Sequence, residues 1–346
     1  MSEASPSARL NLLTLERNIP VSVTIELTRR CPLACLHCYL PETRGRAGQG
    51  RELSAAQWEN VLAQLAAAGG LYLVFTGGEP LLRPDLTRLC AFAKKLNFDV
   101  RVFSTGLGLD RRRALELKNA GVSAFEISFY GRPALHDSVT GLEGSYRASL
   151  AAARLLKRAG IKVRMKVPLM RGNFTMAGFL KGLAKQEGFT IAFDPVITAA
   201  NDGNAEAIGL RLSGRQLARS IKLLGGSAVP QVSDGPAPAF DLLCGAGRNV
   251  CALGPDGALY PCLQLPVKLG NLTAKPFSVL WRSSPWLKTW RLAGEKDLKS
   301  CAGCPDAAHC SRCPGISLVE EGDIFAANGP ACSLARARNL SRKNTP

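Results

Sequence analysis

Acidic residues, aromatic side chains and long apolar runs are all scarce in this sequence. Asp and Glu together number 27 against 44 Lys and Arg, and aromatic residues make up 6% of the 346 positions. The most apolar segments, at 71–75 and 122–129, are far shorter than the roughly 20 residues that cross a bilayer. The N-terminus carries Glu3 and has no apolar core or cleavage site, so it does not resemble a secretory signal. We therefore expect a cytoplasmic protein with no membrane association.

The excess of basic residues restricts the partners. The formal net charge of +17 gives a basic surface that can attract nucleic acid, an acidic peptide or an acidic electron-donor protein, or can simply face solvent. The aromatic residues form no stacking platform and no helix concentrates the basic ones, which counts against nucleic acid. We expect no nucleic-acid partner, and a non-catalytic, cysteine-rich nucleic-acid-binding protein stays open as the alternative class.

Six short apolar runs rich in β-branched residues alternate with helical patterns between residues 21 and 196. The expected strands are Val21–Leu27, Leu71–Thr76, Val100–Ser104, Ala124–Phe129, Ile161–Val167 and Thr190–Val196. The expected helices between them are Ser54–Ala68, Pro84–Leu96, Arg111–Asn119, Ser145–Arg158 and Thr175–Gln186. Regular βα alternation predicts the α/β class, with a parallel sheet that is open or curled into a barrel.

The character of the sequence changes after residue 200. Residues 213–224 have a helical pattern, and a segment rich in Pro and Gly follows it. Beyond that segment, NVCALGPDGALYPC predicts a hairpin that turns at 255–257. We expect five parts, which are an N-terminal extension (1–20), a βα segment (21–212), a helix with a linker (213–240), a cysteine-rich module (241–335) and a polar tail (336–346).

Twelve cysteines in a cytosolic chain argue for metal ligation, because that compartment keeps thiols reduced. In TRRCPLACLHC, Cys31, Cys35 and Cys38 lie just past the first expected strand, where three thiolates can wrap one face of an iron-sulfur cubane. Four-iron clusters normally take four cysteine ligands, so one iron would keep an open position for a substrate. The alternatives are His37 as a fourth ligand, or a zinc site that includes His37.

The spacing CPLACLHC resembles the signature of radical SAM enzymes. In that family the open iron binds the amino and carboxylate groups of S-adenosylmethionine (SAM), and one electron from the cluster cleaves SAM to a 5′-deoxyadenosyl radical. The second expected strand ends in FTGGEP, where Gly77, Gly78 and Glu79 resemble the family's GGE motif, which binds the methionine amino group. A plain strand-to-helix turn is the alternative.

Later strands offer further candidates for SAM contacts. Ser104 ends the third expected strand and Ser128 lies near the end of the fourth, positions that in relatives reach the ribose and carboxylate of SAM. On the fifth strand, alternation places Arg164 and Lys166 on one face, where either could pair with the SAM carboxylate or face solvent. Parallel α/β folds place their active sites at the carboxyl ends of strands, where most of these candidates fall.

The C-terminal cysteines resemble the SPASM extension of radical SAM enzymes. Eight thiolates suit two complete four-cysteine clusters. The resemblance implies Cys244, Cys251, Cys262 and Cys313 for the first auxiliary cluster, and Cys301, Cys304, Cys310 and Cys332 for the second. One departure is visible, because two residues separate Cys310 from Cys313 where the family usually has three. A pair of structural zinc sites is the alternative, although the gap between Cys304 and Cys310 is shorter than the roughly 15–20 residues between zinc-ribbon pairs.

Three further residues are expected to be structural. Cys90 lies on a helical pattern and is expected to be a buried core thiol. His136 and Asp137 are expected to cap and anchor a helix.

The resemblance implies a partial (β/α)6 TIM barrel followed by a small SPASM domain, with three 4Fe-4S clusters and SAM as cofactors. It implies an oxidoreductase that abstracts hydrogen from a ribosomal peptide and crosslinks, epimerises or oxidises it. A small-molecule substrate such as a tetrapyrrole or sugar is the alternative. The segment PCLQL at Cys262 lacks the Asp that sulfatase-activating relatives carry there, which argues against that reaction. The sequence assigns no catalytic residue.

The expected partners follow from the charge and from this resemblance. A basic surface favours an acidic leader on the peptide and an acidic flavodoxin or ferredoxin as electron donor. The first expected strand begins at Val21, which leaves too few residues for a fused leader-binding domain. We therefore expect a separate leader-binding protein or direct docking of the peptide.

Overall fold

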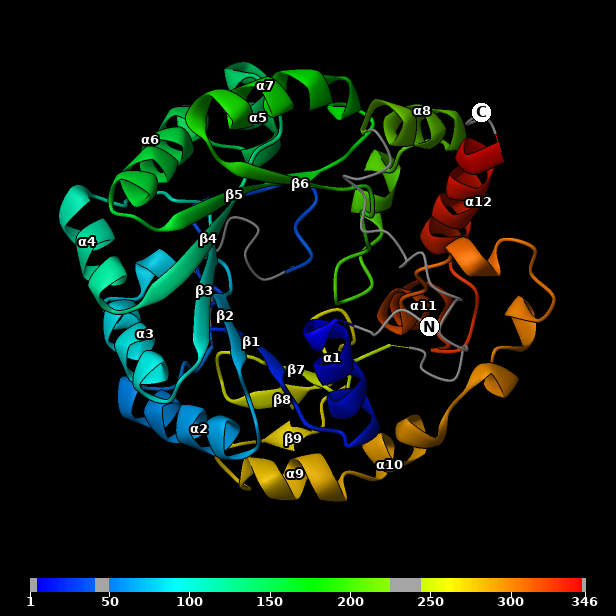
Figure 1. Cartoon of the computed structure of the whole chain (residues 1–346), viewed down its shortest axis with the longest axis horizontal. Helices are drawn as coiled ribbons and strands as arrows, with labels where there is room; N and C mark the ends of the chain where they lie inside the picture. Colours follow the sequence, from blue (N-terminus) through cyan, green and yellow to red (C-terminus); the bar gives the residue numbers. More distant parts are fainter. Residues whose placement is uncertain (1–4, 41–49, 225–243, 344–346) are drawn as a thin grey trace.

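The computed structural model describes residues 5–40, 50–224 and 244–343, and its strands form one curved sheet (Figure 1). The strands of the N-terminal part are β1 (Ser22–Glu26), β2 (Tyr72–Thr76), β3 (Asp99–Ser104), β4 (Val122–Ser128), β5 (Lys162–Pro168) and β6 (Thr190–Asp194). The C-terminal part adds β7 (Val250–Leu253), β8 (Ala258–Tyr260) and β9 (Gly270–Asn271).

Helices line the outer side of this sheet (Figure 1). Those between the parallel strands are α2 (Ala55–Ala67), α3 (Leu86–Lys95), α4 (Arg111–Asn119), α5 (Pro133–Thr140), α6 (Ser145–Arg158) and α7 (Ala177–Glu187). The C-terminal part contains α8 (Gly214–Leu224), α9 (Phe277–Ser283), α10 (Pro285–Leu292), α11 (Pro314–Glu321) and α12 (Gly329–Lys343). None of the described helices combines the length and the apolar character that a membrane span needs.

The sheet confirms the predicted α/β architecture and adds an unexpected continuation. Strands β6, β5, β4, β3, β2 and β1 are neighbours in this order and pair in parallel. On the other edge of β1, β7 also pairs in parallel, with Cys251 opposite Val23. Strands β8 and β9 then continue antiparallel, which confirms the hairpin predicted at 255–257. The cysteine-rich module therefore extends the sheet of the partial barrel.

Alternation along the strands creates the core between the sheet and the helices. Leu73 and Phe75 on β2, and Phe125 and Ile127 on β4, are fully buried and belong to one apolar cluster. That cluster also takes in Trp58 of α2. Burying one large apolar side chain stabilises the fold by roughly 1.5–3 kcal/mol relative to leaving it exposed. The other face of these strands is more polar and faces the inside of the curve.

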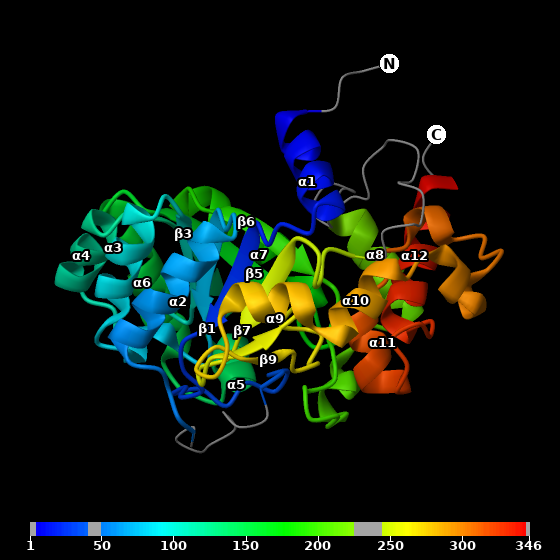
Figure 2. The ribbon, with the colours of Figure 1, turned by 90° about the horizontal axis from the view of Figure 1, so that it is seen from below.

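An unpredicted helix, α1 (Pro6–Glu16), lies within the N-terminal extension. In Figure 2 it projects from the end of the molecule opposite α5. The side chain of Asn249, next to β7, donates a hydrogen bond of 2.9 Å to Asn11 Oδ1 on this helix. The apolar residues of this helix show little helical periodicity, but Ser5 as N-cap with Pro6 at the first helical position was a start signal that could have predicted it. Contacts with the C-terminal part help to place the helix.

Other sequence predictions have mixed outcomes. Asp137 on α5 accepts hydrogen bonds from the backbone N–H groups of Gly144 and Tyr146 at the start of α6, which confirms its anchoring role. Cys90 is fully buried, as expected. Within the predicted polar tail, residues 336–343 lie in α12. The linker predicted up to residue 240 lies outside the described residues from 225 onward.

The first prediction concerns the buried face of β4. We expect Phe125→Ala to lower the free energy of unfolding by about 3–5 kcal/mol, because the truncation leaves a cavity where no solvent reaches. Urea denaturation of the iron-loaded protein under anaerobic conditions measures this change. Leu292→Ala is the control, since Leu292 is 81% exposed and should change stability by less than about 0.5 kcal/mol. Equal unfolding midpoints for the two variants would contradict the core assignment.

Candidate active site and auxiliary cysteine sets

The cysteine loop, residues 31–38, follows β1 and brings three partly buried thiols together. Burial raises the pKa of Cys31 to about 11 and that of Cys35 to about 12, and both thiols are close enough to Cys38 for it to raise their pKa further. Thiols must lose their protons to bind a metal, so metal and protons compete in this loop. Three thiols from one short loop form the donor set that the spacing predicts.

This donor set fits a 4Fe-4S cubane, whose ligands bind separate irons and therefore stand farther apart than the ligands of one ion. Among the described residues, no three His, Cys, Asp or Glu side chains are placed to hold a single metal ion. A cubane held by three thiolates keeps one iron available for a further ligand. The loop is therefore suited to a cluster that binds a second molecule.

His37, considered above as a fourth ligand, lies against Tyr130 instead. Its Nε2 atom is 3.4 Å from the Tyr130 hydroxyl, which also contacts the Cys35 thiol. Burial, with a contribution from Lys166, lowers the pKa of His37 to about 4 and keeps the ring neutral. Within the described residues its Nδ1 atom is buried and has no hydrogen-bond partner. His37 and Tyr130 together form part of the wall beside the cysteine loop.

The Gly77–Gly78 turn after β2 supports the backbone that leads into the cysteine loop. The Gly78 N–H donates to the Thr28 carbonyl (2.8 Å), and the Glu79 N–H donates to the Arg30 carbonyl (2.8 Å). A Cβ atom on Gly77 would lie 2.3 Å from the Thr28 oxygen, and one on Gly78 would lie 2.2 Å from the Arg30 oxygen. Only glycine permits this approach, so the turn fixes the position of the cysteine loop.

Glu79 is fully buried and both of its carboxylate oxygens accept hydrogen bonds. Oε1 accepts from the Ser104 hydroxyl (2.8 Å) and from the Leu81 N–H (2.9 Å). Oε2 accepts from the Thr105 N–H (2.7 Å) and the Thr105 hydroxyl (2.5 Å). Burial raises the pKa of Glu79, while these donors oppose the rise. The carboxylate joins the ends of β2 and β3 behind the Gly77–Gly78 turn.

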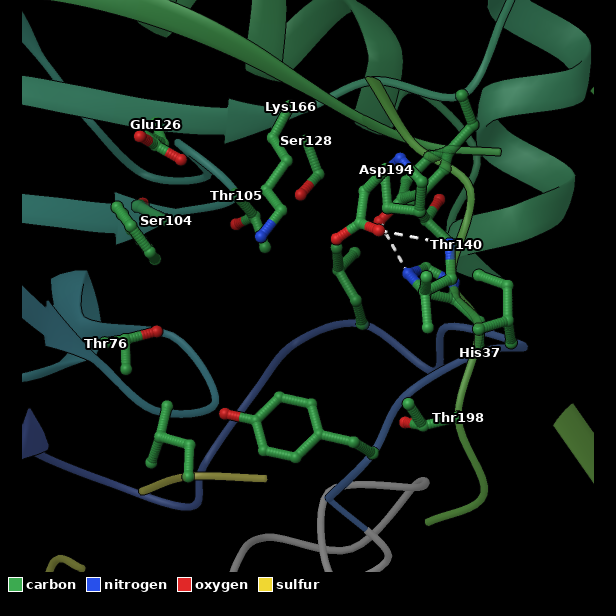
Figure 3. A pocket seen from close by; sticks show the side chains of 18 of the residues that line it. His37, Thr76, Ser104, Thr105, Glu126, Ser128, Thr140, Lys166, Asp194 and Thr198 are labelled. Carbon is green, nitrogen blue, oxygen red and sulfur yellow. Dashed lines mark hydrogen bonds between the residues drawn. The ribbon is translucent and has the colours of Figure 1, made fainter. Parts of the chain in front are cut away.

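A pocket of about 520 Å³ lies inside the curve of the sheet, at the carboxyl ends of the strands. Its lining comes from successive strands, and Figure 3 shows the labelled side chains around it. The cysteine loop contributes Leu33 and His37, followed by Tyr39. The wall across from the strands includes Gln264 and Cys313 of the cysteine-rich module. The pocket is therefore shared between the barrel and that module.

Five of the seven predicted SAM-contacting residues line this pocket. They are Gly77, Gly78, Ser104, Ser128 and Lys166. Glu79 lies behind the turn, and Arg164 forms an ion pair of 3.3 Å with Glu126. Register explains the difference between the two basic residues of β5, because Lys166 is opposite Ser128 near the strand end and Arg164 is one pleat earlier.

Sequence reasoning did not single out several pocket residues. Glu126 and Asp194 bring carboxylates from β4 and β6, and Tyr39 and Tyr130 bring phenol groups. Asp194 ends its strand and Glu126 shares the face of Ser128, so strand position was the signal that could have found them. The Tyr39 hydroxyl donates to Glu26 (2.7 Å). These groups give the pocket acidic and phenolic side chains beside the ammonium group of Lys166.

The eight C-terminal cysteines fall into two sets according to which thiols perturb one another. In the first set, Cys262 raises the pKa of Cys244 and of Cys251, and Cys313 acts on Cys244 and Cys262. The second set is separate from it: Cys301, Cys304 and Cys332 raise the pKa of Cys310, and Cys301 and Cys304 raise that of Cys332. These sets are the two that the SPASM resemblance implies.

Two residues of the loop after β6 connect it to the other parts of the site. The Asn201 N–H donates to the Tyr39 carbonyl (2.9 Å), and its side-chain amide donates to the Leu263 carbonyl (3.4 Å). Farther along, Arg211 pairs with Glu320 of α11, whose carboxylate also accepts from the Ala199 N–H. The loop therefore spans from the cysteine loop to the cysteine-rich module and closes one side of the pocket.

The second prediction tests the role of the turn. We expect Gly78→Ala to lose most of the iron bound by the cysteine loop, about four irons per chain, because the new methyl group displaces the Arg30 carbonyl. Iron analysis after anaerobic reconstitution measures the loss. Gly172→Ala is the matched control, since a Cβ atom there meets nothing within 4 Å. Full iron loading of both variants would contradict the role of the Gly77–Gly78 turn in positioning the cysteine loop.

Comparisons with known proteins agree with this geometry. Residues 25–175 match the family model of the radical SAM superfamily, and residues 244–305 match the SPASM iron-sulfur cluster-binding domain. A PqqA peptide cyclase of Streptomyces rochei is 31% identical, with 93% of this chain and 91% of that protein covered. A PqqA peptide cyclase of Gluconobacter oxydans is 29% identical, with 91% of each chain covered.

Two solved structures share the fold. The crystal structure of Streptococcus suis SuiB bound to S-adenosylmethionine superposes with a TM-score of 0.70 at 17% identity, over 94% of this chain and 81% of SuiB. The structure of anSMEcpe with bound AdoMet gives a TM-score of 0.72 at 17% identity, over 94% of this chain and 93% of that protein. Such domains imply 4Fe-4S clusters and SAM, and a count of three clusters fits the architecture. The chain belongs to the radical SAM superfamily and is a SPASM-containing radical SAM enzyme.

Proposed function

We propose that this enzyme modifies a ribosomally made peptide and that the modification is a crosslink within that peptide. The observation that carries the proposal is the shared pocket, which the cysteine loop, the strand ends and the cysteine-rich module all line. The substrate class and the crosslink follow from the relatives, which are named peptide cyclases. Epimerisation and side-chain oxidation are the other outcomes that the same hydrogen abstraction permits.

The residues that we assign to the cofactors follow from their positions. We assign Cys31, Cys35 and Cys38 to the SAM-binding cluster, and the two C-terminal cysteine sets to the auxiliary clusters. When bound, SAM and the reduced cluster supply a 5′-deoxyadenosyl radical. This assignment leaves the three thiols of the loop dedicated to one cluster and the eight C-terminal thiols to two.

Different side chains of the pocket are assigned to SAM and to the peptide. Lys166 offers its ammonium group to the SAM carboxylate, and Ser104 and Ser128 offer hydroxyls from neighbouring strands. Glu79 and Arg164 act from outside the pocket, Glu79 by fixing the turn and Arg164 by holding Glu126. Gln264 lies across the pocket, where a peptide would pass between barrel and module. The chain therefore orients SAM mainly through groups at the strand ends.

We infer acidic partners from the positive net charge of the chain. Two thiols of the second auxiliary set, Cys304 and Cys332, are exposed, and Arg336 is close enough to Cys332 to affect its pKa. We propose that an acidic flavodoxin or ferredoxin delivers electrons at this exposed and basic edge. An acidic leader on the peptide and a discrete leader-binding protein complete the proposed partners. The chemistry fits a cytosolic setting, where thiols stay reduced.

The third prediction tests the reaction itself. Anaerobic enzyme supplied with SAM, a reductant and a PqqA peptide should form 5′-deoxyadenosine and a peptide that is two hydrogens lighter. Liquid chromatography with mass spectrometry measures both products. The triple variant C31A/C35A/C38A should form neither, because no cluster binds SAM. SAM cleavage that leaves both the mass and the stereochemistry of the peptide unchanged would reject this substrate. An unchanged mass with one inverted residue would replace the crosslink by epimerisation.

The fourth prediction tests the electron donor. We expect the rate of SAM cleavage driven by an acidic flavodoxin to fall about tenfold or more as salt rises, because ions screen attraction between opposite charges over a Debye length of about 10 Å at 0.1 M. Reduction by dithionite in the same salt series is the control and should change little. A flavodoxin-driven rate that is independent of salt would count against docking at a basic surface.

A further inference from the structure

Arg312 occupies the two-residue gap between Cys310 and Cys313, at the point where this chain departs from the usual family spacing. Cys310 belongs to the second cysteine set and Cys313 to the first. The backbone N–H of Arg312 donates to the Cys310 thiol. Arg312 is therefore connected to the second set by its own backbone N–H and to the first set by the peptide bond to Cys313.

Hydrogen bonds on one side hold the Arg312 guanidinium. Its Nε and Nη2 atoms donate to the Ala326 carbonyl at 3.2 Å and 2.9 Å, and Nη2 also donates to the Ile324 carbonyl. The Ser317 hydroxyl accepts a further bond of 3.2 Å from Nη2. The remaining nitrogen, Nη1, is buried and has no partner in the described part of the chain. A fixed cation thus keeps one buried NH2 group, with its two N–H donors, unused by the described part of the protein.

The charge of Arg312 acts on both cysteine sets. Thiols of both sets lie close enough to Arg312 to interact with its charge: Cys301 and Cys310 of the second set, and Cys313 and Cys244 of the first. Two other arginines near the cysteines, the buried Arg248 and the half-buried Arg338, are each close to only one set. Arg248 acts on Cys244, and Arg338 is close to Cys310. Among the arginines that the structure describes, Arg312 is the one whose charge lies close to thiols of both sets.

Loading the two sets with clusters would place two negatively charged groups near this guanidinium. Four thiolates and the sulfides leave each 4Fe-4S cluster with a net negative charge, and an arginine keeps its proton under all ordinary conditions. A positive charge at a fixed distance stabilises an added electron, most strongly where water is excluded. The unused Nη1 donor also suits a sulfur acceptor, because hydrogen bonds to sulfur raise the potential of a cluster.

We propose that Arg312 is a potential-setting residue shared by both auxiliary clusters, and that its guanidinium raises the reduction potential of each. Reduction adds one electron to a cluster from the external donor, and the fixed positive charge near both clusters favours that addition. The same charge offsets the repulsion between two reduced clusters. This inference rests on the proposed ligand sets, which iron analysis of Cys310→Ala and Cys313→Ala variants tests separately.

The fifth prediction measures the two potentials directly. In the C31A/C35A/C38A background, which keeps only the auxiliary clusters, Arg312→Gln should weaken the one-electron reduction of both clusters at least tenfold, which is about 59 mV. A redox titration followed by electron paramagnetic resonance gives both values. Arg248→Gln and Arg338→Gln are the matched controls, and each should shift only the cluster whose thiol it approaches.

Arg312→Lys separates charge from structure, because it keeps the charge and loses the bonds to Ala326 and Ser317. We expect the equilibrium constant for the one-electron reduction of each cluster in this variant to stay within about threefold of its value in the parent. Unchanged potentials in an iron-replete Arg312→Gln variant would overturn the proposal, as would a shift of only one cluster. Equal shifts in the Gln and Lys variants, or loss of iron from both, would show that Arg312 acts through structure and would also overturn it.

Discussion

The contact between two stretches of backbone, residues 28–30 and the Gly77–Gly78 turn, is the constraint on which this site depends. Two N–H groups of the turn region donate to carbonyls just ahead of the cysteine loop, and no side chain fits between them. Glu79 follows the turn and accepts four hydrogen bonds, one from Leu81 two residues later and three from Ser104 and Thr105 at the end of β3. The cysteine loop has little regular structure of its own, and these contacts fix its position relative to the sheet. A set of cluster ligands requires such fixed positions.

The second organising feature is the parallel pairing of β1 with β7, which makes one sheet out of two functional parts. Because Cys251 lies on β7 and the cysteine loop follows β1, the first C-terminal cysteine set and the cysteine loop share one hydrogen-bonded frame. Asn201 and Glu320 add polar connections across the open side of the barrel. Electron transfer and substrate binding both depend on fixed distances, and this frame supplies them.

The sequence predicts the elements well because their signals are local. The β-branched runs indicate the six parallel strands, and cysteine spacing separates the loop from the two C-terminal sets. Position along a strand is less visible: alternation puts Arg164 and Lys166 on the same face, yet only Lys166 reaches the pocket. The burial of Glu79 and the role of Arg312 depend on neighbours remote in sequence, as does the pairing of β1 with β7. Contacts between residues far apart in the chain leave no local pattern in a single sequence.

The pairing of β1 with β7 also has a consequence for biosynthesis. β1 is among the first strands to leave the ribosome, whereas its partner ends at Leu253, near the three-quarter point of the chain. During most of translation one edge of β1 therefore lacks its hydrogen-bonding partner, and an unpaired edge is a template for association with other chains. The edge of β1 stays open until the C-terminal part emerges, and only then does β1, which leads into the cysteine loop, have partners on both sides.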